Sequence, residues 1–495
     1  MTDKHNRPKQ RTVKGFKDSL WVESLFRRSM LQSIRSVFEN YGFLPLETPA
    51  LEYVDVLGKF LPDSTEVEEG LFAFESEEEW VALRYDLTAP LSRVVAQYQD
   101  LPVPFRRYQV GRVWRREKPG LGRFREFTQF DIDTVGSSLM LADCEVCAAL
   151  VDALLVLGIK QDDFEIRISN RKIINGVLEL AGINQTDSKG NPNEQYLRVL
   201  RSIDKIDRLG TDGVLQLLLH GRIDKSGDMT EGAFLTKEQW ENILWFFESP
   251  RNSRKEVLSY LLDSMKNSSV GMEGVEELTE IDSLLSTMGY DDTSIIFDPL
   301  LVRGMSYYTG PVFEAYLKIE FKDEKGRKRE FGSIAGGGRY DDLIGRFKGQ
   351  KVPATGISIG IDRLLAALMY MKPESPPFWR SPVVVTVMDN DRINDYLKIT
   401  SELREADISA EMFLGTGGFQ KQMKYADKRG ALIAIIAGSD EFDNNTITIK
   451  DLMLGRELSK DLSDRKDWLS EQPSQVTVPR SDLIKTVKEI ISRYK

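Results

Sequence analysis

The chain of 495 residues is poor in the side chains that carry most nucleophilic and metal chemistry, with only two cysteines and two histidines. So few cysteines argue against a disulfide-built secreted fold and suit a reducing compartment. Cys144 and Cys147 form a CxxC pair in a helix-like stretch without a second pair or a nearby histidine, which favours buried cysteines over a zinc site. With only His5 and His220, neither a Ser/His/Asp triad nor an HExxH site can be assembled.

Long hydrophobic runs are also missing from the sequence. The longest, such as residues 431–437, are far shorter than the roughly 20 residues of a membrane-spanning helix, so we expect no membrane span and a cytoplasmic protein. The basic first 17 residues lack the apolar core of a secretory signal. No GxxxxGK[ST] and no GxGxxG motif occurs, which removes the main support for a P-loop or dinucleotide-binding fold.

Basic residues gather in one segment of an otherwise acidic chain. The net charge is −10, from 67 Lys and Arg against 77 Asp and Glu, which by itself speaks against a nucleic-acid partner. Residues 105–125 nevertheless carry eight basic side chains against one acid. Such a segment could bind phosphates, and an ordinary solvated hairpin is the simpler alternative.

Residues 106–135 read as two strands joined by a loop at 118–122. Because side chains alternate along a strand, the odd-numbered ones would share one face if the register aligns them. That face would hold Arg115, Glu117, Arg123, Arg125, Phe127, Gln129, Asp131 and Asp133. It would offer arginines for phosphates, a ring for stacking a base, and a carboxylate with an amide for a polar ligand; a plain polar sheet face is the alternative.

The remaining pattern divides the chain into segments. Apolar residues at helical spacing predict a helix over residues 19–39, and residues 170–290 read as polar and helical. Strand-like, glycine-rich sequence resumes at 295, and four prolines at 371–382 mark a linker. Alternating strands and helices after 383 predict a small α/β domain with a parallel or mixed sheet.

Five sequence blocks together closely resemble the histidyl-tRNA synthetase family, which belongs to the class II aminoacyl-tRNA synthetases. They are RYDLTAP at 84–90, VWRRE at 113–117 with GRFREFTQFDID at 122–133, LVRGMSYYTG at 301–310, AGGGRYD at 335–341 and GISIGIDR at 356–363. The RGxxYY and GGGRYD blocks are typical of the histidyl branch. Beyond the linker, FQKQMKYAD at 419–427 and IKD at 449–451 are similar to the family's anticodon-binding domain.

The resemblance implies an α+β fold, with a class II catalytic domain on an antiparallel sheet, a helical insertion and a C-terminal α/β anticodon-binding domain. The expected boundaries are 1–169 and 295–372 for the catalytic domain, 170–294 for the insertion and 383–495 for the anticodon-binding domain. The implied reaction joins L-histidine to tRNA(His), with ATP as substrate and Mg²⁺ as cofactor. A homodimer through the motif around Tyr41 and Pro49 is also implied.

The resemblance further implies roles for individual residues. The catalytic residues would be Arg303 and Arg115, with Arg303 bridging the substrate carboxylate and the α-phosphate. The histidine-binding residues would be Asp86, Leu87, Thr88, Arg115, Gln129, Asp133, Arg303, Tyr307 and Tyr308. The ATP-binding residues would be Arg115, Glu117, Arg123, Phe127 and Arg363. The sequence assigns no ligand to Mg²⁺, and Ser306 stands where many family members have an acid.

Two other functions fit a protein with this resemblance. One is a catalytically silent paralogue that regulates ATP phosphoribosyltransferase, and the other is a sensor of uncharged tRNA. Such proteins typically lose motif residues or the C-terminal domain. Arg115, Arg303 and Arg363 are present, and so is the C-terminal domain, so the enzyme is the favoured interpretation.

Overall fold

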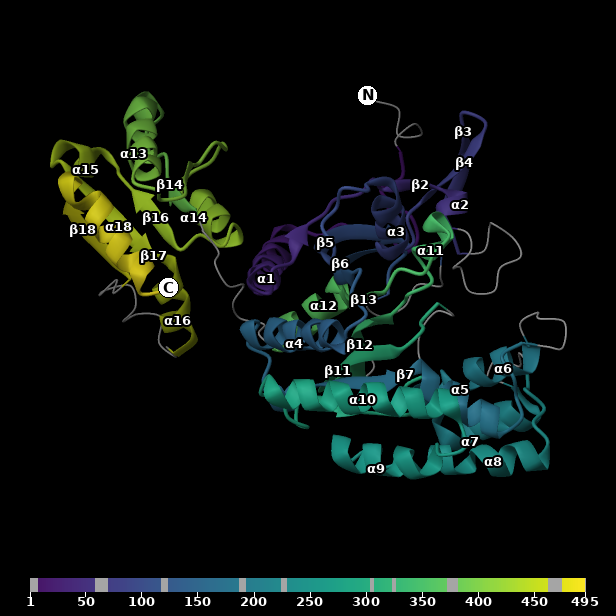
Figure 1. The fold of residues 1–495 in the computed structure, drawn as a ribbon. Coiled ribbons are helices and arrows are strands. Elements are labelled where there is room, and N and C mark those ends of the chain that lie inside the picture. Colours follow the sequence, from purple (N-terminus) through teal and green to yellow (C-terminus); the bar gives the residue numbers. More distant parts are fainter. Residues whose placement is uncertain are drawn as a thin grey trace. The chain divides into compact units, whose positions relative to one another are not determined.

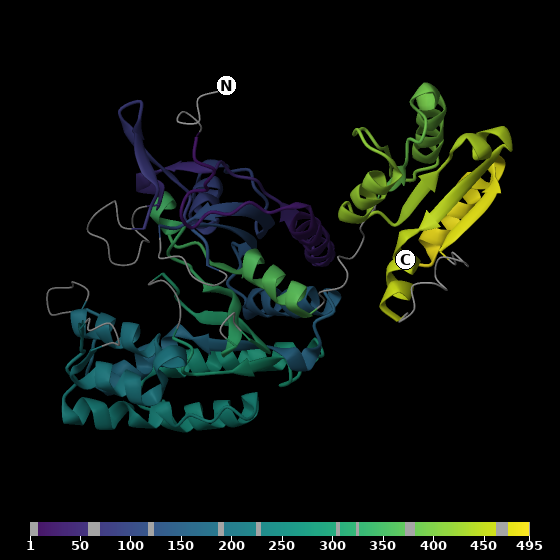
Figure 2. The same cartoon turned by 180° about the vertical axis from the view of Figure 1, so that it is seen from behind.

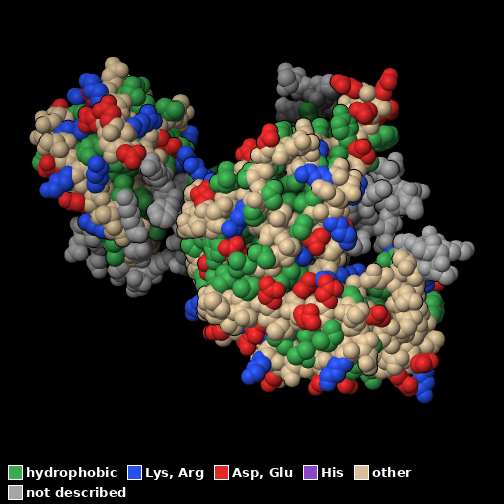
Figure 3. Space-filling model, viewed as in Figure 1, with side chains coloured by type: hydrophobic (Ala, Val, Ile, Leu, Met, Phe, Trp, Pro, Cys, Tyr) green, Lys and Arg blue, Asp and Glu red, His purple; other side chains and the backbone are tan. Residues whose placement is uncertain are grey.

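The computed structural model describes residues 8–57, 70–116, 123–186, 193–223, 229–302, 307–322, 326–371, 382–461 and 474–494. The chain forms two compact units, Met1–Ser375 and Pro376–Lys495 (Figures 1 and 2). Among the described residues, no helix combines the length and apolar character that a bilayer span requires. Acidic and basic side chains are interspersed over the face drawn in Figure 3.

An eight-stranded sheet forms the centre of the first unit, with the strand order β1-β5-β6-β13-β12-β11-β7-β10. The strands are β1 Leu44–Pro45, β5 Phe105–Trp114, β6 Glu126–Val135, β7 Phe164–Asn170, β10 Ile295–Phe297, β11 Pro311–Lys322, β12 Lys328–Arg339 and β13 Ala354–Gly360. The six central strands pair antiparallel, and the edge strands β1 and β10 pair parallel. The antiparallel sheet of the predicted α+β fold is therefore present.

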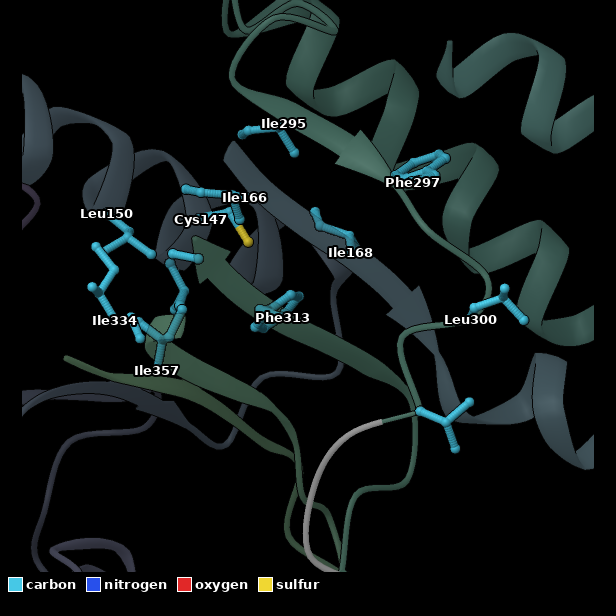
Figure 4. Close-up of a cluster of buried hydrophobic side chains, with 14 of the residues drawn as sticks. Cys147, Leu150, Ile166, Ile168, Ile295, Phe297, Leu300, Phe313, Ile334 and Ile357 are labelled. Carbon is cyan, nitrogen blue, oxygen red and sulfur yellow. The ribbon is translucent and has the colours of Figure 1, made fainter. Parts of the chain in front are cut away.

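Three helices contribute to the hydrophobic core beside this sheet: α1 Trp21–Asn40, α4 Met140–Val156 and α12 Ile361–Met371. Helix α1, predicted from apolar spacing, buries Phe26, Met30, Ile34 and Phe38 at intervals of four residues, which is one face of a helix. In the same core, Figure 4 shows side chains of α4 among those of the sheet strands. Both cysteines lie buried and unbridged in α4, as expected.

A helical region lies in the chain between β7 and β10. Its elements are α5 Arg171–Leu180, α6 Glu194–Ile203, α7 Ile206–Leu219, β8 Gly221–Ile223, β9 Met229–Glu231, α8 Lys237–Phe247, α9 Arg254–Ser264 and α10 Ser269–Thr287. Helices α5 and α10 cross closely at two glycines, because a Cβ on Gly176 would lie 2.7 Å from the Gly271 Cα. Apolar side chains from this region join the hydrophobic cluster of the large sheet.

Smaller elements complete the first unit. A three-stranded sheet has the order β2-β4-β3. These elements are β2 Leu51–Tyr53, α2 Val54–Leu57, β3 Ala73–Ser76, β4 Glu79–Leu83, α3 Thr88–Gln97 and α11 Gly345–Lys348, with a 3₁₀ turn at Gln161–Asp163. Helix α3 begins at Thr88, within the RYDLTAP block, so that block includes the beginning of a helix.

The second unit has a mixed sheet with the order β15-β14-β16-β17-β18. Its elements are β14 Val383–Val385, α13 Ile393–Glu405, β15 Ala410–Met412, α14 Phe419–Lys428, β16 Ile433–Ile436, α15 Ser439–Asp443, β17 Thr446–Asp451, α16 Leu452–Asp461, β18 Gln475–Pro479 and α18 Leu483–Ser492. Strands β15, β14 and β16 are parallel, and β17 and β18 are antiparallel. A separate core of buried aliphatic side chains holds this unit together, and the predicted α/β domain is confirmed.

Candidate active site

The β5–β6 hairpin gathers the odd-numbered side chains on one face of the sheet. Its register places Arg107 opposite Asp133, and Gln109 opposite Asp131. Odd positions therefore face odd positions throughout the hairpin, as predicted from the alternation of side chains. The even positions Phe130 and Ile132 point to the other face, where they join the hydrophobic core.

A cavity of about 380 Å³ lies over this face. Six residues predicted from the sequence line it: Arg115, Arg123, Phe127, Gln129, Tyr308 and Arg363. A larger hollow of about 530 Å³ lies on the second unit and contains none of the predicted residues. In that hollow, Arg480 and Glu402 already pair with each other at 2.8 Å. The cavity over the sheet holds the residues predicted from the sequence, so we assign the candidate site to it.

Two arginines reach the cavity from different elements. Arg115 follows β5, and its Nε donates to the Tyr85 carbonyl at 3.3 Å. Its guanidinium lies 4.3 Å from the ring centre of Tyr85 and 5.2 Å from that of Phe127. Arg363 lies in the first turn of α12, and its Nη1 donates to the carbonyl of Ser333 on β12. These contacts direct two cationic groups at the same space.

Asp362, the neighbour of Arg363, ties three elements together. Its Oδ1 accepts from Nη2 of Arg27 on α1 at 2.8 Å, and its Oδ2 accepts from the backbone N–H of Thr128 on β6 at 2.7 Å. Arg27 also donates to the Thr128 hydroxyl at 3.0 Å. The beginning of α12, and with it Arg363, is thereby held against α1 and the hairpin.

Three buried carboxylates that interact electrostatically form a group called here the acidic pocket: Asp86, Asp131 and Asp133. They do not line the cavity themselves, but Asp131 and Asp133 lie on the same face of β6 as Gln129, which does. Asp133 lies 2.7 Å from Nη2 of the fully buried Arg107, and its Oδ1 accepts from the Tyr340 hydroxyl. Burial raises the pKa of Asp131 and of Asp133, and the Arg107 charge opposes that shift. Asp86 accepts from the backbone N–H groups of residues 88 and 89 at 3.1 and 2.9 Å, at the beginning of α3.

Among the described residues predicted to bind histidine, Tyr307 and Tyr308 interact electrostatically with the acidic pocket. The Leu87 carbonyl accepts from Arg107 at 3.2 Å, and Thr88 begins α3. The rings of Tyr307 and Tyr308 lie 4.7 Å apart, and burial raises the pKa of both phenols. Gln129 donates to the Ser358 hydroxyl at 2.7 Å.

Glycines allow these side chains to lie against the backbone of the sheet. Gly356 on β13 pairs with Asp133 on β6, and a Cβ there would lie 2.5 Å from Asp133 Cγ and 2.6 Å from the Ile132 carbonyl oxygen. A Cβ on Gly338 would lie 3.0 Å from the Tyr308 ring. Two glycine-containing blocks of the sequence therefore give space to two predicted histidine-binding side chains.

The described arginines of the basic segment 105–125 do not form one positive surface, because several pair with acids of neighbouring elements. Arg107 is buried against Asp133, Arg106 pairs with Glu145 at 3.0 Å, and Arg112 pairs with residue 126 at 2.9 Å. Neighbouring strands and helices supply these acids, which a count along the chain does not reveal. Of the segment's described arginines, Arg115 and Arg123 line the cavity.

Sequence reasoning did not assign Arg107 or Tyr340 to the site, although both contact Asp133. The odd position of Arg107, opposite Asp133 in the hairpin register, was the available signal. Tyr340 belongs to the GGGRYD block, so its presence in a quoted motif was a second signal. Glu117, Arg303 and Ser306 lie outside the described residues.

An antiparallel sheet that brings arginines from a strand hairpin and from the beginning of a following helix to one cavity is the arrangement of class II aminoacyl-tRNA synthetases. The chain belongs to the histidyl-tRNA synthetase family, whose profile matches residues 15–364. A profile for an anticodon binding domain matches residues 382–490.

Individual proteins support this assignment over nearly the whole chain. The histidine–tRNA ligase of Cereibacter sphaeroides is 50% identical over 489 residues, which cover 98% of each chain. That of Dinoroseobacter shibae is 50% identical over 490 residues, again 98% of each chain. The crystal structure of histidyl-tRNA synthetase from Nostoc sp. PCC 7120 has a TM-score of 0.73 and 29% identity, covering 98% of this chain and 100% of that one.

Proposed function

We propose that the protein is a histidine–tRNA ligase. It activates L-histidine with ATP to histidyl-adenylate and pyrophosphate, and then transfers histidine to the 3′ end of tRNA(His). The observation that carries the proposal is the acidic pocket beside a cavity lined by Arg115, Arg123 and Arg363. One region thus offers anions for a cationic amino acid and cations for the phosphates of ATP. The family relation supports the same reaction.

The acidic pocket suits the α-ammonium and imidazole groups of histidine. Gln129 Oε1 and Asp131 Oδ1 are buried and accept no hydrogen bond from any described residue. Buried acceptors without donors are costly, so a ligand that brings N–H groups stabilises them. The α-ammonium binds Asp86, Thr88 and Gln129 in this proposal. The imidazole lies between Asp133 and Tyr308, one partner for each ring nitrogen, with Tyr307 and Leu87 beside it.

The cavity suits ATP. Phe127 offers a ring face on which the adenine stacks, since base–aromatic stacking is tolerant of orientation and worth about 1–3 kcal/mol. Arg115, Arg123 and Arg363 hold the phosphates through charge-assisted hydrogen bonds. Glu117 accepts from the exocyclic amine of adenine in this proposal.

The reaction needs positioned charge and no general base. The histidine carboxylate is already a nucleophile and attacks the α-phosphorus in line, while pyrophosphate leaves from the opposite side. Arg303 and Arg115 bind the carboxylate and the α-phosphate together and stabilise the negative charge of the transition state. This chemistry agrees with a chain that contains only two histidines.

The cavity fits a Mg²⁺ ion that arrives with ATP. Glu314 lines the cavity and is buried, with its Oε2 accepting from the Tyr316 hydroxyl at 2.6 Å. Within the described ranges, no three His, Cys, Asp or Glu side chains come together as a metal cage. Mg²⁺ is usually bound by one or two carboxylates together with substrate phosphates. Glu314 and the phosphates would hold the ion, which neutralises charge on the leaving pyrophosphate when it is bound.

The second unit binds the anticodon of tRNA(His) in this proposal. Helix α14 carries the half-exposed aromatic residues Phe419 and Tyr425 together with Lys421 and Lys424. Rings that stack on bases, with lysines for the phosphates, are the usual means of binding single-stranded RNA. The match to an anticodon binding domain supports this role.

We also propose a homodimer that acts in the cytoplasm, where charged tRNA is used. Exposed apolar side chains gather on β1 and on the β2-β4-β3 sheet, in the region of the motif around Tyr41 and Pro49. Leu51, Tyr53 and Phe74 share one face of the small sheet, and Leu44 on β1 is exposed as well. Apolar groups of this kind on a surface commonly mark an interface between subunits.

ATP–pyrophosphate exchange by the purified protein tests the proposed function. The assay is run without tRNA, against each of the twenty amino acids in turn. Exchange that depends on histidine alone is the expected result. Exchange with none of them would favour a regulatory subunit or a tRNA sensor and would overturn the proposal.

A further inference from the structure

Arg107 is a fully buried cation next to the acidic pocket. We propose that Arg107 is a positioning residue for histidine recognition, which holds Asp133 in place and, together with Asp131, sets the net charge that the substrate meets. This inference rests on the proposed function. Arg107 acts through Asp133 and is not itself a catalytic residue.

The strand register and the contacts of Arg107 support this role. Arg107 on β5 lies directly opposite Asp133 on β6. Its Nη2 is 2.7 Å from Asp133 Oδ2 and 3.9 Å from Asp131 Oδ2, and donates to the Leu87 carbonyl at 3.2 Å. A buried guanidinium is tolerated only with close counter-charges, so Arg107 and the two carboxylates constrain one another.

Asp133 is held from its other sides as well. The Tyr340 hydroxyl donates to Oδ1, while Gly356 on β13 leaves room for the carboxylate to lie against the strand. Arg107 lies at ion-pair distance from Oδ2, which accepts no hydrogen bond from any described residue. Asp133 therefore presents its remaining lone pairs in a fixed direction, which is what a site needs to distinguish imidazole from a ring without nitrogen.

Charge balance gives Arg107 a second effect. The acidic pocket holds the acids Asp86, Asp131 and Asp133, and Arg107 is the buried cation that contacts two of them. The buried Arg84 also interacts electrostatically with Asp131. The phenols that face it, Tyr307, Tyr308 and Tyr340, stay neutral, because burial raises their pKa values. Burial and the Asp86 charge already raise the pKa of Asp133, and without the opposing charge of Arg107 that pKa would rise further.

The test compares variants in histidine-dependent ATP–pyrophosphate exchange across neutral pH. Arg107→Met should raise KM for histidine about 10- to 100-fold at neutral pH, from the loss of a charge-assisted contact, and leave KM for ATP within about twofold. The histidine defect should shrink as pH rises, because Asp133 ionises again. Arg107→Lys should restore part of the affinity. Arg112→Met, at an even position near the end of the same strand and with a side chain 65% exposed, is the matched control and should behave as wild type.

Three outcomes decide between the proposals. Absence of histidine-dependent exchange by the wild-type protein would overturn the proposed function itself. With an active wild type, a folded Arg107→Met variant that keeps the histidine KM, or that raises both KM values equally at every pH, overturns the role of Arg107. If Arg107→Met does not fold, the charge-balanced pair Arg107→Met with Asp131→Asn and the variant Arg107→Lys replace it. If one of these two variants folds and keeps the wild-type KM for histidine, Arg107 has only a structural role. The same conclusion follows if neither variant folds.

Discussion

Replacing Gly356 by alanine tests the placement of Asp133 in the histidine site. The new Cβ would lie 2.5 Å from Asp133 Cγ and 2.6 Å from the Ile132 carbonyl oxygen, where ordinary contacts are 3.4–4 Å. The carboxylate must therefore retreat by roughly 1 Å, because the packed strands leave the alanine nowhere else to go. That movement breaks the contacts of Asp133 with Arg107 and Tyr340, whose present positions depend on it.

The size of the effect follows from these distances. A misplacement of about 1 Å at a reacting site costs on the order of 100-fold in rate, so kcat/KM for histidine should fall by about that factor, equivalent to roughly 2.7 kcal/mol. KM for ATP should stay within about twofold, since Gly356 does not line the cavity. Overpacking a core position costs about 1–3 kcal/mol, so the variant should unfold at a lower temperature and still fold.

The assay is ATP–pyrophosphate exchange with histidine and ATP varied separately, together with a thermal unfolding curve. Gly418→Ala is the matched control, because a Cβ at that position meets nothing within 4 Å and it lies in the second unit. A folded Gly356→Ala protein with a wild-type kcat/KM for histidine would refute the reasoning, since the position of Asp133 would then have no part in the use of this substrate.

Three further changes separate the roles of other elements. Arg303→Ala should leave histidine affinity by calorimetry nearly unchanged and slow adenylate formation at least 100-fold, because its contact is made mainly in the transition state; a near-wild-type rate would remove Arg303 from the catalytic residues. Deleting all residues after Met371 should preserve adenylate formation but greatly weaken tRNA charging, and equal charging would contradict the anticodon-binding role. Arg27→Met removes one contact to Asp362 and one to Thr128, and should raise KM for ATP about tenfold with histidine affinity intact. Equal losses for both substrates would point to general unfolding instead.

Alternation along strands made the site face predictable from the sequence. The odd positions of residues 106–135 were expected to share a face, and the antiparallel register of β5 and β6 confirms this for residues 106–114 and 126–135. The helix over 19–39 was also predictable, because its apolar spacing reflects one buried face. Both patterns depend on the local geometry of a strand or a helix, which the sequence alone determines well.

Features of the site that the sequence did not predict depend on contacts between different elements of the fold. Arg107 counted as one of eight cations in a basic segment, whereas its burial depends on acids across the hairpin and on Leu87. Tyr340 and Gly356 reach Asp133 from segments more than 200 residues further along the chain, so no local pattern relates them. The edge strands β15 and β18 were not predicted, since three to five residues leave little hydrophobic pattern.

The strand order of the large sheet also has a consequence for synthesis on the ribosome. Strand β6 pairs with β13, and Val135 lies opposite Ala354, so its partner is made long after β6 itself. At roughly 5–20 residues per second, a gap of roughly 220 residues lasts on the order of 10–40 s. During that interval the apolar side of the β5–β6 hairpin lacks part of its cover, which exposes the nascent chain to aggregation. Assembly of the histidine site is therefore a late event in translation, and substrates can stabilise the fold only after residues from both ends of the first unit have emerged.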